Sequence, residues 1–100
     1  MIKSEATWKE LTGRLQRGEK ITGTVFRQET FGVFVDIGEA FHGIVLAPHI
    51  STKIGLELEE YPKVGNTITA IVLDFAPNDR GDLEWRYISL SIKHLKTDVI

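Results

Sequence analysis

The sequence predicts an all-β protein, a small five-stranded barrel that one short helix precedes. Three observations support this fold class. A single helical pattern stands near the N-terminus, five strand-like segments follow it, and one long connection separates the third segment from the fourth. Helix-length segments do not alternate with strands, so a parallel α/β sheet is not expected. Five short strands with one long connection are typical of a closed or partly open barrel rather than a sandwich.

The expected helix lies within residues 4–18, "SEATWKELTGRLQRG". Thr7 and Glu10 have the spacing of a capping box, and Gly18 stands where a C-terminal glycine is common. The apolar residues recur at helical spacing, at Trp8, Leu11 and Leu15. We expect this apolar stripe to pack on the main domain.

The strand-like segments are rich in β-branched and aromatic residues, and turn residues separate them. They cover residues 20–28, 31–37, 40–46, 67–76 and 83–92. The long connection covers residues 47–66. The OB-fold is the commonest barrel with this strand count and this connection, so we expect an OB-fold. In that fold the outer face of the second and third strands is the usual groove for oligonucleotides or oligosaccharides.

Composition excludes several classes of function. The chain of 100 residues has no cysteine, which rules out disulfides and thiolate metal sites, and its three histidines lack metal-ligand spacing. No catalytic constellation or phosphate-binding glycine loop is present, so we expect neither an enzyme nor a cofactor, a metal or a small-molecule substrate. No apolar run reaches the length of a membrane span and no secretory signal is evident, so a cytoplasmic protein is expected. The net charge of −2 means that a nucleic-acid site would have to be local.

Two phenylalanines three residues apart, Phe31 and Phe34, raise a question about the second strand. Its buried face is expected to alternate through Val33, Val35 and Ile37. Phe34 then points outward, and a bulge at Gly32 would let Phe31 join it. Such a pair offers a platform on which unstacked bases lie, worth ~1–3 kcal/mol per base. The alternative is that Phe31 caps the barrel end from inside and the helix covers Phe34.

Several motifs occur in order at consistent spacings between residues 18 and 93. They are "GEKITGTVFRQETFGVFVDIGEAFHGIVLAPHIS", "YPKVGNTITAIVLDFAP" and "RYISLSIK". Together they resemble the S1 RNA-binding domain found in ribosomal protein S1 and in many RNA-processing enzymes. We therefore expect an N-terminal helical extension at 1–18, an S1-like OB-fold domain at 19–95 and a C-terminal tail at 96–100.

The resemblance implies an OB-fold that binds single-stranded RNA, with Phe31 and Phe34 as two of the contact residues. Three other contacts of the family differ in this sequence. Leu46 stands where a histidine is expected, Ala76 where an aspartate is expected and Tyr87 where an arginine is expected. Tyr87 retains the capacity to stack or to donate a hydrogen bond.

Nearby residues are candidates to replace the missing contacts. His42 and His49 lie close in sequence to the position of the family's histidine, and Arg86 adjoins Tyr87, although strand alternation aims it at the opposite face. The candidate RNA-binding residues are Phe31, Phe34, His42, His49, Arg86 and Tyr87. Trp85 either extends the aromatic surface or packs under the helix against Trp8, and packing is slightly favoured.

Two functions remain open. The first is a single-domain protein that binds single-stranded RNA weakly and with low sequence specificity through the aromatic platform. The second is a protein-interaction module, such as an inhibitor or immunity-type partner, that reuses the same face of the barrel. The potential around Phe34 discriminates between them: a positive surface favours RNA, and a negative surface, such as Glu57, Glu59 and Glu60 would create, favours a protein.

Overall fold

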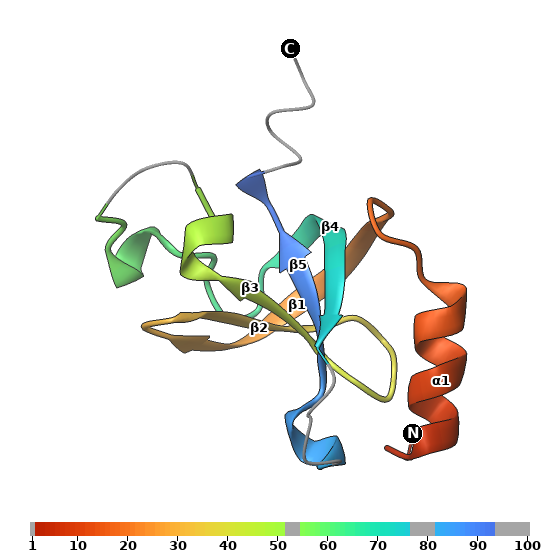
Figure 1. The fold of residues 1–100 in the computed structure, drawn as a ribbon. Helices are drawn as coiled ribbons and strands as arrows, with labels where there is room; N and C mark the ends of the chain where they lie inside the picture. Colours follow the sequence, from red (N-terminus) through yellow and green to blue (C-terminus); the bar gives the residue numbers. More distant parts are fainter. Residues whose placement is uncertain (1, 52–54, 77–81, 94–100) are drawn as a thin grey trace.

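A computed structural model describes residues 2–51, 55–76 and 82–93 of the chain (Figure 1). Its helix α1 spans Glu5–Arg14. The strands are β1 (Lys20–Glu29), β2 (Gly32–Asp36), β3 (Gly43–Leu46), β4 (Thr67–Ala76) and β5 (Tyr87–Ser91). Three short 3-10 helices lie between strands, η1 (Ala47–His49), η2 (Leu58–Glu60) and η3 (Leu83–Trp85). The expected boundary between the domain and its C-terminal tail lies outside the described residues.

The five strands form a closed barrel in the order β1-β2-β3-β5-β4, which confirms the predicted fold class. β3 and β5 are parallel, and every other neighbouring pair is antiparallel. The long strand β1 closes the barrel because it pairs with β2 along one half and with β4 along the other. Thr24 marks the crossover, opposite Asp36 on one side and Thr67 on the other. Just before it, a Cβ at Gly23 would lie 2.5 Å from a Val35 methyl and 2.6 Å from the backbone oxygen of Asp36, so the close approach of β1 to β2 requires glycine there.

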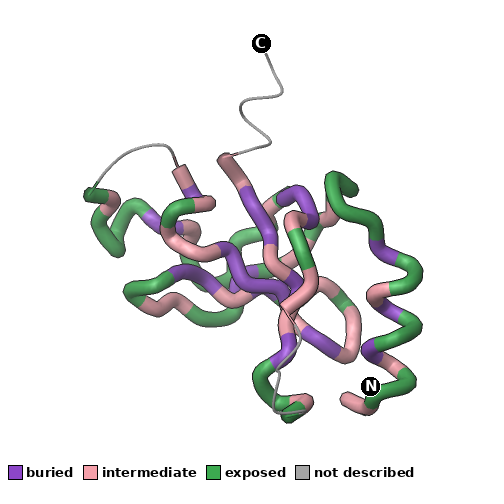
Figure 2. Tube along the Cα trace, in the orientation of Figure 1, coloured by how far each residue is buried: buried purple, intermediate pink, exposed green. Residues whose placement is uncertain are grey.

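Alternating side chains of the strands fill the barrel interior, which Figure 2 shows as buried segments at the centre of the molecule. The most deeply buried strand residues are Val25, Val33, Val35, Val45, Val72, Ile88, Leu90 and Ser91. Phe34, between two of these valines, points outward and is half-buried. The interior is thus filled almost entirely by aliphatic side chains, and the aromatic residues of β1 and β2 remain available to the surface.

The helix α1 packs through the predicted stripe of Trp8, Leu11 and Leu15, all buried. It stands beside the barrel, against the connection between β2 and β3, and it does not cross the outer face of these strands (Figure 1). The Trp8 ring meets the buried Phe41 ring edge to face at 4.9 Å. The expectation that α1 packs on the main domain is therefore confirmed, and the alternative in which the helix covers Phe34 is wrong.

The predicted caps of α1 were wrong. Ser4 is the N-cap: its hydroxyl accepts a hydrogen bond from the Thr7 amide, and the Thr7 hydroxyl accepts one from the Ser4 amide. Glu10 instead forms an ion pair with Arg14 one turn further on, at 2.9 Å. The helix ends at Arg14, and Gly18, with a φ of +89°, belongs to the turn that leads into β1.

The predicted bulge at Gly32 was also wrong. Gly32 is the first residue of β2 and pairs regularly with Glu29 and Leu46. A Cβ there would lie 2.3 Å from a backbone oxygen of β3, so close strand approach explains this glycine. Phe31 escapes strand alternation for another reason, because it lies in the turn Thr30–Phe31 that joins β1 to β2.

The last strand is shorter than expected. Residues Leu83–Trp85 form η3, whose N-cap Asp82 accepts a hydrogen bond from the Glu84 amide, and β5 starts at Tyr87. Trp85 is 70% exposed, so the favoured expectation that it packs under the helix was wrong. Residues 77–81, where turn residues were expected to separate the last two strands, lie outside the described residues.

Candidate nucleic-acid interface

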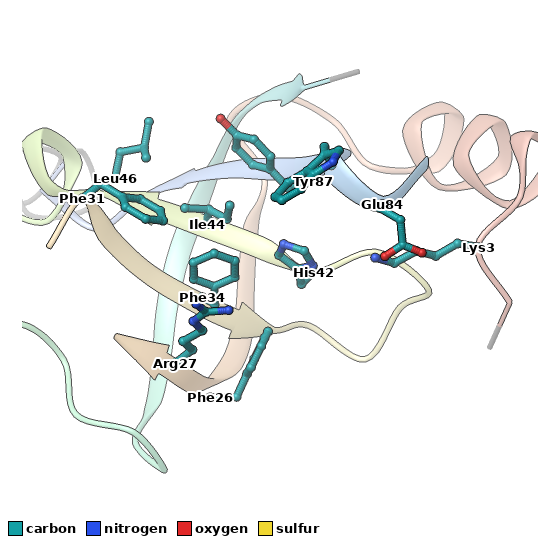
Figure 3. A pocket seen from close by; sticks show the side chains of 11 residues that line it. Lys3, Phe26, Arg27, Phe31, Phe34, His42, Ile44, Leu46, Glu84 and Tyr87 are labelled. Carbon is teal, nitrogen blue, oxygen red and sulfur yellow. The ribbon is translucent and has the colours of Figure 1, made fainter. Parts of the chain in front are cut away.

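A groove of about 540 Å³ lies on the outer face of the barrel, over β2 and β3 (Figure 3). Six ring-bearing side chains line it, which are Phe26, Phe31, Phe34, His42, Trp85 and Tyr87. They come from β1, the β1–β2 turn, β2, the β2–β3 connection, η3 and β5. Ile44 and Leu46 of β3 add apolar surface between them. The surface is thus aromatic over most of its length, with few polar groups.

A bulge in β1 brings Arg27 to the same outer face as Phe26, which strand alternation alone does not predict. Val25 pairs with Val35, but the next pair is Arg27 with Phe34, so Phe26 is the extra residue. Both Phe26 and Arg27 are exposed and line the groove, while Val25 stays in the core. Alternation outward from Val25 predicts Phe26, whereas no local signal in the sequence predicts that Arg27 shares its face.

The rings form a cluster around Phe34. Its centroid lies 5.8 Å from that of Phe31 and 5.9 Å from that of Phe26, both edge to face, and 5.2 Å from His42, which is stacked on it. Phe31 is 50% exposed and Phe26 is 47% exposed. A cluster that is braced by ring contacts and open to solvent is a suitable surface for stacking flat ligands.

The charged residues of the groove carry both signs. Among the residues that the structure describes, Lys3, Arg27 and Glu84 line it. The Arg27 guanidinium lies 5.3 Å from the centre of the Phe34 ring and also pairs with Glu29 at 3.3 Å. Glu29 therefore offsets the charge of the cation that lies nearest to Phe34. The acidic residues of the long connection do not line the groove.

His42 is held in its neutral form at neutral pH. Burial among the rings lowers its pKa below the ordinary value of 6.5, and the positive charge of Lys3 lowers that pKa further. A neutral imidazole stacks on Phe34 without adding a charge. It also keeps one nitrogen as a donor and the other as an acceptor.

Four of the six predicted site residues meet in the groove, and two do not. Phe31, Phe34, His42 and Tyr87 line it, whereas His49 and Arg86 do not. His49 lies in η1, where its carbonyl accepts the Ile92 amide. The Arg86 side chain is 7% exposed and forms an ion pair with Glu5 at 2.6 Å, as strand alternation away from Tyr87 requires.

Sequence reasoning did not assign Phe26, Arg27, Lys3 or Glu84 to this site. Alternation from the buried Val25 places Phe26 on the outer face, whereas the position of Arg27 depends on the cross-strand register of β1. The position of Glu84 in the groove depends on the turn of η3, and that of Lys3 depends on how α1 docks on the barrel. The sequence has no local signal for either of these last two, because neither lies in a strand of the barrel.

A five-stranded barrel of this order, with exposed rings over β2 and β3, is an OB-fold with its usual ligand groove. The chain belongs to the S1 RNA binding domain family, whose model matches residues 14–93. Small ribosomal subunit protein bS1 of Neisseria meningitidis is 35% identical over 92 residues, which are 91% of this chain and 15% of that protein. The bS1 of Leuconostoc lactis is 34% identical over 89% of this chain and 19% of its own length. This chain therefore spans less than a fifth of these relatives.

Solved structures show the same fold. GSP13 from Bacillus subtilis superposes with a TM-score of 0.68 and 26% identity, over 83% of this chain and 59% of that one. A chain in the a/eIF2alpha-aDim2p-rRNA complex from Pyrococcus horikoshii superposes with a TM-score of 0.65 and 21% identity, over 80% of this chain and 45% of that one. At that identity the second likeness concerns the fold alone.

The described part of the chain has neither a metal-binding cluster nor a membrane-spanning helix. No group of three or more histidine, cysteine, aspartate or glutamate side chains there is placed to hold a metal ion. No helix among those residues is long and apolar enough to cross a membrane.

Proposed function

We propose that this protein binds single-stranded RNA in the groove over β2 and β3, through a platform that consists of Phe26, Phe31, Phe34 and His42. The observation that supports this proposal most directly is the ring cluster itself. Its members contact one another at 5.2–6.0 Å yet leave two phenylalanines about half exposed. Single-stranded nucleic acid offers the matching chemistry, because every unstacked base has an apolar face that rings accept.

Binding in this site is weak and has low sequence specificity. Stacking tolerates any base, and the groove offers few polar side chains to read base edges. Among the described residues two cations, Lys3 and Arg27, line the groove, and Arg27 also pairs with Glu29, so the electrostatic part of the affinity is small. Tyr87 supplies a hydroxyl where the family's arginine is expected, which provides a hydrogen bond without a charge.

The remaining properties follow from this reading. Residues 19–95 act as a single S1-like domain, with the helical extension 1–18 and the tail 96–100 at its ends. The protein works in the cytoplasm as a binding module, without catalysis, a cofactor, a metal or a small-molecule substrate. Its relatives among the bS1 proteins are ribosomal subunit proteins by name, and RNA is the partner that this chain's own groove suits best.

Chemical-shift mapping tests this proposal residue by residue. The labelled protein is titrated with a single-stranded RNA of about a dozen nucleotides, a length within the ~4–16 that one OB-fold covers. The expected result is that the largest amide shifts fall on β1 around Phe26, on the Thr30–Phe31 turn and on β2. Shifts that avoid these strands would refute the platform, and the absence of any shift would favour the protein-interaction alternative.

A further inference from the structure

The N-terminal segment reaches the groove although it lies outside the part of the chain that the S1 family model matches. That match begins at residue 14, whereas Lys3 is one of the residues that line the groove. Figure 3 shows Lys3 and Glu84 at one end of the groove, and Phe31 and Leu46 at the other. Lys3, a cation outside the residues that the family model matches, thus lies where a bound RNA strand would leave the ring cluster.

Several contacts hold this segment in place. The capping box of Ser4 and Thr7 fixes the first turn of α1 immediately after Lys3. One turn further on, Trp8 is buried against Phe41. These contacts fix the direction of the chain at Lys3, so the lysine is positioned by the helix and is not part of a free tail.

A buried arginine of the barrel forms a second anchor for α1. Arg86, directly before β5, donates a hydrogen bond of 2.6 Å to the Glu5 carboxylate, and its guanidinium lies 5.7 Å from the centre of the Trp8 ring. An almost fully buried guanidinium needs a carboxylate partner, since an unpaired buried charge is costly. The residue next to Tyr87 therefore holds the helix and not the ligand.

The ammonium group of Lys3 is available to a ligand. It lies 5.8 Å from the centre of the Phe41 ring, and its charge acts on His42. Among the residues that the structure describes, no carboxylate forms an ion pair with it. Glu84 lines the same end of the groove (Figure 3).

We propose that the N-terminal segment belongs to the RNA site. Lys3 binds a backbone phosphate at the Glu84 end of the groove, and the Glu5–Arg86 ion pair anchors α1 and so keeps Lys3 in position. This inference rests on the proposed function. It assigns Lys3 a direct contact and Arg86 a positioning role. It also means that the barrel without α1 has one cation fewer at its groove, with Arg27 left alone near Phe34.

The salt dependence of RNA binding tests the contact. Each phosphate neutralised on a single strand contributes about −0.7 to the slope of log K against log [salt]. Lys3→Met should therefore make the slope shallower by about 0.7, whereas Lys3→Arg should restore it. Lys9→Met is the matched control, because Lys9 is an exposed lysine of α1 that does not line the groove, and its slope should equal that of the unmodified protein. Glu5→Gln, which weakens the anchor, should shift the slope in the same direction as Lys3→Met.

A second measurement needs no RNA. The titration of the His42 imidazole, followed by NMR, should have a midpoint that rises in Lys3→Met and stays unchanged in Lys9→Met, because the charge of Lys3 acts on His42.

If RNA binds but Lys3→Met and Lys9→Met give equal salt-dependence slopes, this inference is overturned and the proposed function stands. If the unmodified protein binds no RNA at any salt concentration, both fail.

Discussion

Replacing Phe34 by alanine removes the ring on which the platform is centred. Phe34 contacts Phe31, Phe26 and His42, and Arg27 lies over its face. The side chain points out of the barrel and is only half-buried, so the core loses little when it is truncated. The variant should therefore separate RNA affinity from stability.

The expected loss of affinity follows from the stacking free energy. One base stacked on an aromatic side chain is worth ~1–3 kcal/mol, which corresponds to a Kd about 5- to 150-fold higher in Phe34→Ala. The neighbouring residue provides the opposite control. Val35 is 1% exposed, and Val35→Ala should cost about 2 kcal/mol of stability, or roughly 8–16 °C in Tm. Its Kd, measured where the variant is still folded, should stay within about two-fold, well below the loss expected for one stacked base.

Both variants are assayed by fluorescence anisotropy with the same RNA and by thermal unfolding. The reasoning requires a large change in Kd for Phe34→Ala and a large change in Tm for Val35→Ala. It would be refuted by the reverse pattern, in which Phe34→Ala lowers Tm as much as Val35→Ala and leaves Kd unaltered. That outcome would make Phe34 a structural residue.

Three further predictions concern the groove charge, the helix anchor and the tight strand pairing. Glu84→Gln removes the carboxylate that lines the groove, so RNA binding measured by anisotropy should strengthen by up to about five-fold, and weaker binding would contradict this account. The hydrogen bond from Arg86 lowers the pKa of Glu5 below 4.5 in the folded protein. As the pH falls, the Glu5 carboxylate is therefore protonated earlier in the unfolded chain than in the folded one. The stability that the pair provides is present above pH 4.5 and is lost as the pH falls through the folded pKa. Denaturant unfolding of Glu5→Gln should therefore vary less with pH across this window, and an equal variation would argue against the anchor. Gly32→Ala places a Cβ 2.3 Å from a backbone oxygen and should lower the stability measured by thermal unfolding by about 1–3 kcal/mol. The control Gly13→Ala, on an open helix face, should raise that stability by about 0.5–1 kcal/mol. Equal effects of the two substitutions on stability would count against close strand approach at Gly32.

The barrel and the centre of the platform were predictable from sequence because both depend on local rules. Alternation of Val33 and Val35 in β2 places Phe34 outside without any knowledge of the other strands. The turn position of Phe31 was not foreseen, yet its consequence, a second exposed ring beside Phe34, was the same. Local patterns therefore placed both rings on the outer face of the barrel.

The rest of the site depends on contacts between segments far apart in the sequence. Arg27 reaches the groove because β1 has an extra residue relative to β2, which is a property of the pair and not of either strand. Arg86 was a candidate through its proximity to Tyr87, and its true partner, Glu5, lies 81 positions away in the chain. Lys3 reaches the groove only after α1 has docked on the barrel, and periodicity contains no information on where a helix docks.

The most direct test of the central claim is an anisotropy titration of a labelled single-stranded RNA of about a dozen nucleotides, at low and at physiological salt. The account predicts saturable binding that weakens as salt is added and that disappears in the double variant Phe31→Ala/Phe34→Ala. An absence of binding even at low salt would contradict it. The barrel would then be an S1 domain whose groove serves a protein partner.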